Sequence, residues 1–304
     1  MQRRALLAGF AAALAAGAVR AVAWAPAAIP VVTFNVLAPL WAAPKWYPDE
    51  LDPSLLDADF RRARTISFLQ GLRGKVDVFC LQEVEQREYP AYLAALGPDF
   101  EGRFASHDPA YWASYLVPEL PWVPNGNALI VRRQAFRGRV FSDLSLGGTG
   151  NHAVALEAQH VGSGRQARLF SVHLDADRND GRRTELKSLL EQAPARKGYV
   201  DIIAGDINED TVTGSASEIL DRADFIDVLA ALGNRESTHP FRESYNKAQR
   251  WGIIDHVLCR GGQALAGTVF DSGTAMIEDE VARIAENFRQ VGSDHYPVGG
   301  TCGV

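Results

Sequence analysis

Six strand-like segments of this sequence run directly into carboxylate, amide or imidazole side chains. These side chains are Asn35, Glu83, His173 with Asp175, Asp206 with Asn208, Asp255 with His256, and Asp294 with His295. Because strand ends on one edge of an α/β sheet converge on a crevice, we expect them to lie together. Carboxylate and amide oxygens suit a hard cation such as Mg²⁺ or Mn²⁺, and histidines can donate to a phosphoryl oxygen or carry a proton. The pattern therefore predicts metal-assisted hydrolysis of a phosphate ester.

Each of these residues, taken alone, also has an ordinary structural explanation. Glu83 would be a surface residue at a strand end, His173 a hydrogen-bonded core histidine, and Asp206 with Asn208 an Asx turn. Ser293 raises the alternative of a serine nucleophile, but the surrounding Gly-Ser-Asp-His-Tyr-Pro lacks the glycine-flanked elbow that such a serine needs. Polar side chains at six strand ends favour a common site over six separate explanations.

The elements that must position these side chains alternate between strands and helices from residue 30 onward. Patterning predicts strands at 31–38, 75–85, 127–133, 153–160, 167–175, 199–206, 251–259 and 295–302, and helices at 53–74, 88–97, 182–193 and 214–223. Four prolines and several aromatic residues in 100–125 indicate a long irregular loop. We find no repeat or linker, so we expect one domain over 29–304, and the 304-residue chain with 47% hydrophobic content can build its core.

The first 25 residues have the layout of an export signal. Arg3 and Arg4 precede an alanine-rich apolar stretch, which suggests export by the twin-arginine route. Small residues at 21, 23 and 25 favour cleavage near Ala23 or Ala25. The alternative is a short membrane anchor, but the uninterrupted apolar stretch falls short of the ~20 residues that span a bilayer. We therefore expect a periplasmic or secreted protein whose mature form has no membrane span.

The charge and the cysteine content exclude further classes of protein. The whole chain has a net charge of −6, and loss of Arg3, Arg4 and Arg20 leaves 28 basic and 37 acidic residues, a net charge of −9. This argues against a protein held to nucleic acid by a basic surface, although bound cations would reverse the local field of a nuclease site. Three cysteines are too few for a disulfide scaffold; Cys259 and Cys302 are either a single disulfide or packed thiols.

Seven motifs occur along the chain in a fixed order: "TFNVLA", "DVFCLQEVE", "NGNALIVRR", "FSVHLDA", "AGDINED", "GIIDHVLC" and "GSDHYPV". With them the sequence resembles the endonuclease/exonuclease/phosphatase superfamily over residues 31 to 300. The resemblance implies a four-layer α/β sandwich, with two mixed β-sheets packed face to face and helices outside. It also implies Mg²⁺ (or Mn²⁺) as cofactor and a phosphate ester as substrate. We expect a monomer.

The resemblance also assigns roles around the metal and the phosphate. Glu83 would be the main metal-ligand carboxylate, Asn35 would lie beside the metal and its water, and Asp294 would contribute to the metal site. Asn127 would line the phosphate site. The chain departs from some nuclease members at Leu37, where they carry an acidic residue.

The remaining roles implied by the resemblance concern water and proton transfer. Asp206 would orient or deprotonate the attacking water, Asn208 would hydrogen-bond a non-bridging oxygen, and His173 would donate to the scissile phosphate. His295, oriented by Asp255, would contact the phosphate or carry a proton. Residues two apart on an extended segment point to the same side, so Asp206 and Asn208 can act on one substrate.

The leading interpretation is an exported phosphodiesterase, with a nuclease acting on nucleic acid or nucleotides first among its forms. "FNVLAPLW" and "LQEVEQREYPAYLAALG" most resemble the deadenylase, nocturnin and 2′,5′-phosphodiesterase branch. A phosphomonoesterase or sphingomyelinase-like phospholipase on the same core is the alternative within enzymes. A non-catalytic ligand-binding module is disfavoured, because none of Glu83, His173, Asp206, Asn208 and His295 is lost.

Overall fold

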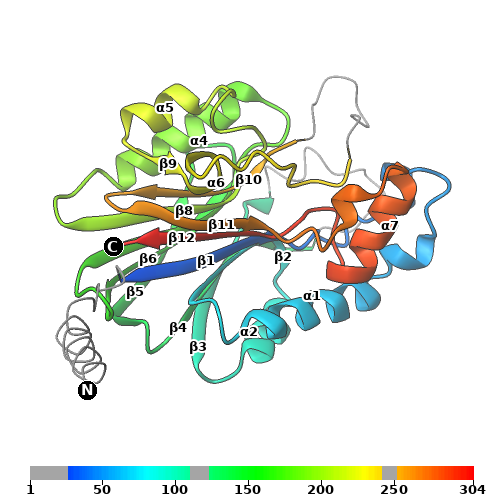
Figure 1. Ribbon diagram of the computed structural model, residues 1–304, viewed down its shortest axis with the longest axis horizontal. Helices are drawn as coiled ribbons and strands as arrows, with labels where there is room; N and C mark the ends of the chain where they lie inside the picture. Colours follow the sequence, from blue (N-terminus) through cyan, green and yellow to red (C-terminus); the bar gives the residue numbers. More distant parts are fainter. Residues whose placement is uncertain (1–26, 110–122, 242–251) are drawn as a thin grey trace, which may run out of the picture.

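Two six-stranded sheets packed face to face form the framework of the computed structural model, which describes residues 27–109, 123–241 and 252–304 (Figure 1). The first sheet has the order β11-β12-β1-β2-β4-β3 and the second β5-β6-β7-β8-β10-β9. In each sheet one neighbouring pair is parallel, β1 with β2 and β7 with β8, and the other pairs are antiparallel. Both sheets are therefore mixed, as the sequence predicts.

The elements have the following bounds. The first sheet contains β1 (Ala28–Asn35), β2 (Val78–Glu85), β3 (Phe100–Ser106), β4 (Asn125–Arg132), β11 (Gln263–Val269) and β12 (Val298–Gly303). The second contains β5 (Phe136–Ser145), β6 (His152–His160), β7 (Gln166–His173), β8 (Tyr199–Asp206), β9 (Ile226–Asp227) and β10 (Asp255–Arg260). The α-helices are α1 (Ala58–Leu72), α2 (Tyr89–Leu96), α4 (Asn179–Gln192), α5 (Ser217–Arg222), α6 (Val228–Ala231) and α7 (Glu280–Val291). The 3₁₀ turns are η1 (Pro44–Trp46), η2 (Pro53–Leu56) and η3 (Thr274–Met276).

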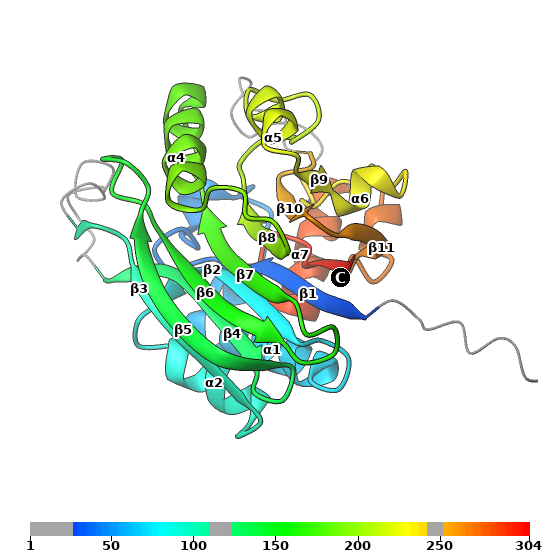
Figure 2. The same ribbon diagram turned by 90° about the vertical axis from the view of Figure 1, so that its left-hand side faces the viewer.

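The central strands are apolar on both faces because both faces are covered. On β1, Ile29 and Val31 enter the cluster between the two sheets, whereas Val32 and Phe34 pack toward the helices. Successive side chains of a strand point to opposite faces, so a run of apolar residues with few polar interruptions is what a doubly covered strand requires. α1 and α2 cover the first sheet and α4 and α5 the second, on opposite sides of the molecule (Figures 1 and 2). The four-layer α/β sandwich is confirmed.

The expectation of an irregular loop over 100–125 is wrong for its first part. Residues Phe100–Ser106 form β3, which pairs antiparallel with β4 at the sheet edge. The alternation of Phe100, Gly102 and Phe104 with polar residues carried this signal, but the prolines that follow hid it. The strands β5 and β11 and the helix α7 were also not expected; α7 has its apolar residues at helical spacing, for example Ile284, Phe288 and Val291.

Two further expectations concern the cysteines and the chain's first residues. All three cysteines are buried free thiols, and those of Cys259 on β10 and Cys302 on β12 are hydrogen-bonded to each other between the sheets. The expected export signal and the aromatic residues of segment 110–122 lie outside the described residues. Among the helices of the described ranges, none combines the length and the apolar character needed to cross a bilayer.

Candidate active site

The residues with predicted roles lie along one edge where the two sheets meet, whereas His256, which was expected there, pairs with Asp227 instead. Asn35, His173 and Asp206 are the last residues of β1, β7 and β8, whereas Asp255 opens the antiparallel strand β10. In the sheet register Asp206 is paired with His173 on one side and with Asp255 on the other. Asp294 and His295 stand just before β12, which runs antiparallel to β1. The topology thus brings together residues that are up to 260 positions apart in the sequence.

A β-bulge directs Glu83 into this edge. The pairing of β2 with β4 shifts between Leu81 and Val84, and Glu83 takes a left-handed backbone conformation with φ of 56°. Such a conformation is costly for a non-glycine residue and is typical of functional sites, where bulges re-aim a side chain. Both Glu83 oxygens accept hydrogen bonds, Oε1 from Asn35 Nδ2 at 2.9 Å and Oε2 from Ala38 N at 2.9 Å. Burial raises the pKa of Glu83, while His173 and Asn35 act in the opposite direction.

The Asn35 amide joins the two sheets at the centre of the site. Its Nδ2 donates both to Glu83 Oε1 at 2.9 Å and to Asp206 Oδ2 at 3.0 Å, and its Oδ1 accepts from Leu37 N at 2.9 Å. The last contact fixes which end of the amide faces the carboxylates. Asn35 therefore holds the carboxylates of Glu83 and Asp206 in place with its nitrogen.

Asp206 is the group on which the other side chains converge. Its Oδ2 lies 3.5 Å from His173 Nε2 and 3.8 Å from His295 Nε2, and its Oδ1 accepts from Asn208 N at 2.9 Å. Burial, together with the nearby Asp255 carboxylate, raises the pKa of Asp206 to about 7. A carboxyl group that titrates near neutrality is suited to accept a proton from water.

His295 and Asp255 form a buried, hydrogen-bonded pair beside Asp206. His295 Nδ1 donates to Asp255 Oδ2 at 2.9 Å, and both residues are at most 5% exposed. Burial opposes the charged ring, but Asp255, Asp206 and Asp294 outweigh it and raise the pKa of His295 to about 10. The ring is therefore an imidazolium at neutral pH, with its Nε2–H turned toward Asp206.

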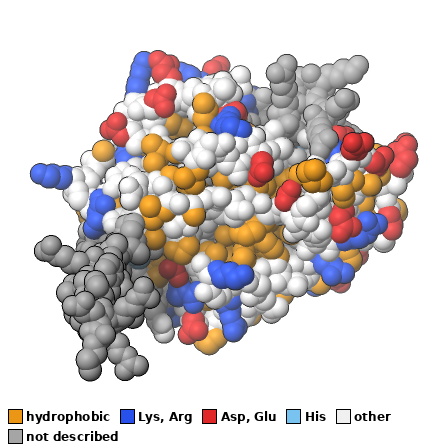
Figure 3. All heavy atoms as spheres, in the orientation of Figure 1, with side chains coloured by type: hydrophobic (Ala, Val, Ile, Leu, Met, Phe, Trp, Pro, Cys, Tyr) orange, Lys and Arg blue, Asp and Glu red, His pale blue; other side chains and the backbone are white. Residues whose placement is uncertain are grey.

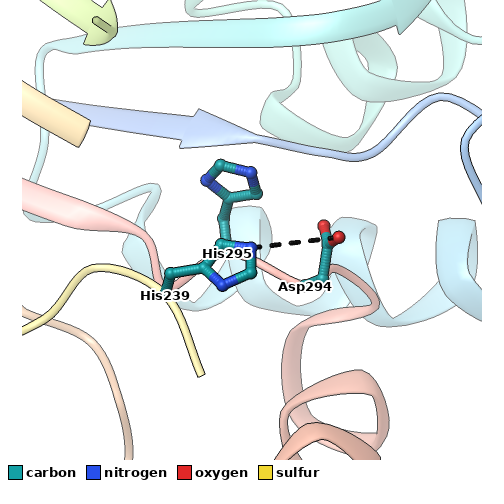
Figure 4. A group of neighbouring side chains, drawn as sticks. All are labelled: His239, Asp294 and His295. Carbon is teal, nitrogen blue, oxygen red and sulfur yellow. Dashed lines mark ion pairs between the residues drawn. The ribbon is translucent and has the colours of Figure 1, made fainter. Parts of the chain in front are cut away.

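Asp294 has two partners that the sequence did not indicate. Tyr47 Oη donates to Asp294 Oδ2 at 3.0 Å, and His239 Nε2 lies 4.0 Å from the same oxygen (Figure 4). His239 packs edge-on against His295, with ring centroids 4.8 Å apart. Phe241 N donates to His239 Nδ1, which places the proton of the neutral ring on Nε2, facing Asp294. Burial and His295 lower the pKa of His239 well below its usual value, so this ring stays a neutral donor.

Two predicted residues contact the backbone in this structure. Asn208 has a positive φ of 57°, which asparagine tolerates, and its Nδ2 donates to Leu174 O at 2.9 Å. Asn127 Nδ2 donates to His152 O at 2.7 Å, which joins β4 to the start of β6. Each amide nitrogen keeps a second N–H, so both side chains retain a donor for a phosphate oxygen.

The residues present fit a divalent cation. Asp294 Oδ1 and Asp255 Oδ1 are buried and have no hydrogen-bond partner among the described residues, which is costly unless a ligand or water satisfies them. Two groups place their ligand atoms within 4.8 Å of one another, His239 with Asp294 and His295, and Asp206 with Asp255 and His295. A metal-binding histidine usually donates with its second nitrogen, whereas His239 accepts there, so the carboxylates are the better candidate ligands.

The fold and this edge define the class of α/β-sandwich phosphoesterases. The chain belongs to the Endonuclease/Exonuclease/phosphatase family, whose model matches residues 32–295. No curated protein matches it.

Solved structures with this fold are similar to the chain over most of its length. An endonuclease/exonuclease/phosphatase from Bacteroides vulgatus has 14% identity and a TM-score of 0.64, covering 91% of this chain and 98% of its own. ANGEL2, described as a 2′,3′-cyclic phosphatase, has 15% identity and a TM-score of 0.64, covering 91% and 95%. Truncated Caenorhabditis elegans TDP2 has 14% identity and a TM-score of 0.61, covering 91% and 98%.

Proposed function

We propose that this chain is an exported, divalent-metal-dependent phosphodiesterase that hydrolyses phosphate esters by in-line attack of water, with nuclease activity as its leading form. The observation that carries the proposal is the Asn35 amide, which holds Glu83 and Asp206 within one hydrogen-bonded group. A candidate metal ligand and a candidate base are thereby fixed side by side. Family membership supplies the general reaction, phosphate-ester hydrolysis.

The carboxylates of Glu83 and Asp294 would hold the cation. Once bound, the cation would neutralise charge on the phosphoryl group and favour the ionised form of the Glu83 carboxylate. Asn35 belongs to this set as the residue that orients Glu83, and Tyr47 and His239 orient Asp294. The cation would give a partner to Asp294 Oδ1, which has no hydrogen-bond partner among the described residues.

The other residues would transfer protons and stabilise the charge that develops on the phosphoryl group. Asp206 accepts a proton from the attacking water. The neutral His173 ring, whose pKa burial lowers, donates to a non-bridging oxygen together with Asn208 and Asn127. His295, protonated at neutral pH, gives its Nε2 proton to the leaving oxygen. Donors placed where charge develops are the main source of rate in phosphoryl transfer.

The charge pattern on one face of the molecule bears on the kind of substrate. Figure 3 shows basic and acidic side chains interspersed on one face, without a basic stripe that would follow a duplex. The arginine pair and apolar stretch of residues 1–25 support export, and a single domain over 29–304 acting as a monomer completes the proposal.

The test compares bis(p-nitrophenyl) phosphate with p-nitrophenyl phosphate, using residues 26–304 with Mg²⁺, with Mn²⁺ and with EDTA. We expect metal-dependent cleavage that favours the diester. Preference for the monoester would replace the proposal with a phosphomonoesterase. The panel continues with RNA, sphingomyelin and 2′,3′-cyclic nucleotides, the last because one structural neighbour is described as a 2′,3′-cyclic phosphatase.

Glu83→Gln should raise the metal concentration needed for half-maximal activity by at least about tenfold, because it removes a ligand charge while keeping the side-chain volume. EDTA should abolish activity in both proteins, and Mn²⁺ titration measures the shift. Glu50→Gln, an exposed residue, is the matched control and should titrate like the unmodified chain. An unchanged metal requirement in Glu83→Gln would remove Glu83 from the metal site.

A further inference from the structure

The segment from Ala38 to Tyr47 is attached to the site at both ends. At its start Ala38 N donates to Glu83 Oε2 at 2.9 Å, and at its end Tyr47 Oη donates to Asp294 Oδ2 at 3.0 Å. Both anchoring residues are buried. This loop, which follows β1 and lies beside α7 in Figure 1, therefore begins and ends at the two proposed metal ligands.

The same loop carries two tryptophans and a lysine close to these anchors. Trp41 N donates to Ala38 O, so Trp41 lies one turn from the first anchor, and Trp46 is the neighbour of Tyr47. The two indole rings pack at 6.3 Å with a tilt of 58°. Trp46 stays 42% exposed, and the Lys45 ammonium lies 4.9 Å from its ring centroid.

A shallow, open depression lies beside the loop. It has a volume of about 770 Å³, and its lining residues are Ala42, Pro44, Pro53, Ser54, Leu56, Asp57 and Phe60. The loop thus offers a flat aromatic surface next to an open depression.

We propose that Trp46, supported by Trp41, is a stacking subsite for a nucleobase of the substrate, with Lys45 placed for an adjacent phosphate. This inference rests on the proposed function and names its substrate class, nucleotides and single-stranded nucleic acid ends. Bases stack on tryptophan irrespective of sequence. The exposed Lys45 contact with Trp46 is weak, so the ammonium can leave the ring for a phosphate when a base arrives.

The charges around the loop disfavour a lipid head group. A quaternary ammonium group would meet the Lys45 ammonium at the ring that should receive it. A neutral planar base flanked by a phosphate is the ligand that matches an indole beside one lysine.

The test uses two esters that release the same p-nitrophenolate, one with a base and one without. For Trp46→Ala, kcat/KM on thymidine 5′-(p-nitrophenyl) phosphate should fall by about 5- to 100-fold, since loss of one stacking contact costs that much. On methyl p-nitrophenyl phosphate it should stay within about twofold. Trp46→Phe should keep most of the activity on the thymidine ester. Val140→Ala, an exposed change on β5, is the control and should alter neither substrate.

Calorimetric titration of adenosine 5′-monophosphate gives a readout without turnover, and Trp46→Ala should weaken this binding by a similar factor. Two results would overturn the subsite. In the first, Trp46→Ala lowers kcat/KM equally on both esters and leaves nucleotide binding unchanged. In the second, Trp46→Ala changes neither kcat/KM nor nucleotide binding. A selective loss of sphingomyelin cleavage would overturn it in favour of a lipid head group. Failure of the unmodified chain on both esters would count against the proposed function, and the nucleotide titration would then decide the subsite alone.

Discussion

Replacing Asp206 with Asn should lower kcat on bis(p-nitrophenyl) phosphate by about 10²–10⁴-fold, the range expected when a general base is lost. The amide cannot take a proton from water at neutral pH, but it matches the carboxylate in shape. Its single amide oxygen can still accept from Asn35 Nδ2, so the neighbouring Glu83 should stay in place, whereas the hydrogen bond from Asn208 N is lost. The measurement is steady-state kinetics at saturating Mn²⁺, with the metal requirement determined in parallel.

The control for this substitution is Asp221→Asn, the same chemical change at an exposed position on α5. It should leave kcat unchanged. Circular dichroism and the melting temperature of both variants establish that they are folded. If Asp206→Asn is folded, binds metal normally and retains more than about a tenth of the original kcat, Asp206 does not act on the water, and the proposed division of roles fails.

The sequence predicted which residues form the site more successfully than it predicted the contacts among them. Asn35, Glu83, His173 and Asp206 could be chosen because their types are unusual at the ends of apolar strands. The bulge that turns Glu83 into the site could not, since it depends on the register of β2 against β4. The fold class could be predicted from the seven motifs, because their order along the chain constrains the whole topology.

Tyr47 and His239 escaped sequence reasoning for a physical reason. Their contacts with Asp294 span 247 and 55 positions, and neither stands at the end of a strand. The only local signals were a tyrosine beside exposed aromatic residues in "PKWYP" and a histidine before proline in "THPF". Asn127 is the reverse case. The sequence indicated it as a phosphate ligand, but it did not indicate the hydrogen bond from Asn127 to the backbone that joins β4 to β6.

Asp255 is the residue that separates the two proton-transfer groups. Burial raises the pKa of Asp206 to about 7 with the help of repulsion from Asp255, and attraction by Asp255, together with Asp206 and Asp294, outweighs burial and raises the pKa of His295 to about 10. A base ionised above pH 7 and an acid protonated below pH 10 are both in their working states between these values. This predicts a plateau of activity over that range for the unmodified chain.

Asp255→Asn should convert this plateau into a decline with rising pH. The amide oxygen can still accept from His295 Nδ1, so the ring keeps its orientation, but the attracting charge is gone. The pKa of His295 falls, and the imidazolium is lost as pH rises through its new value. The pKa of Asp206 also falls, because the repulsion is removed. We expect kcat/KM to drop by about 100-fold at pH 9 and much less at pH 6, measured from pH 5.5 to 10 at saturating metal.

Asp227→Asn provides the matched control, because Asp227 and His256 form another buried pair, with 2.5 Å between Oδ2 and Nδ1. The His256 hydrogen bond outweighs burial and lowers the pKa of Asp227 to about 2, so this pair stabilises the fold above the pKa of the unfolded carboxyl. Its loss should lower the melting temperature at pH 7 and leave the shape of the pH–rate profile intact. A profile for Asp255→Asn that runs parallel to that of the unmodified chain would show that His295 does not deliver the proton. Its contact with Asp206 would then serve only to place the base.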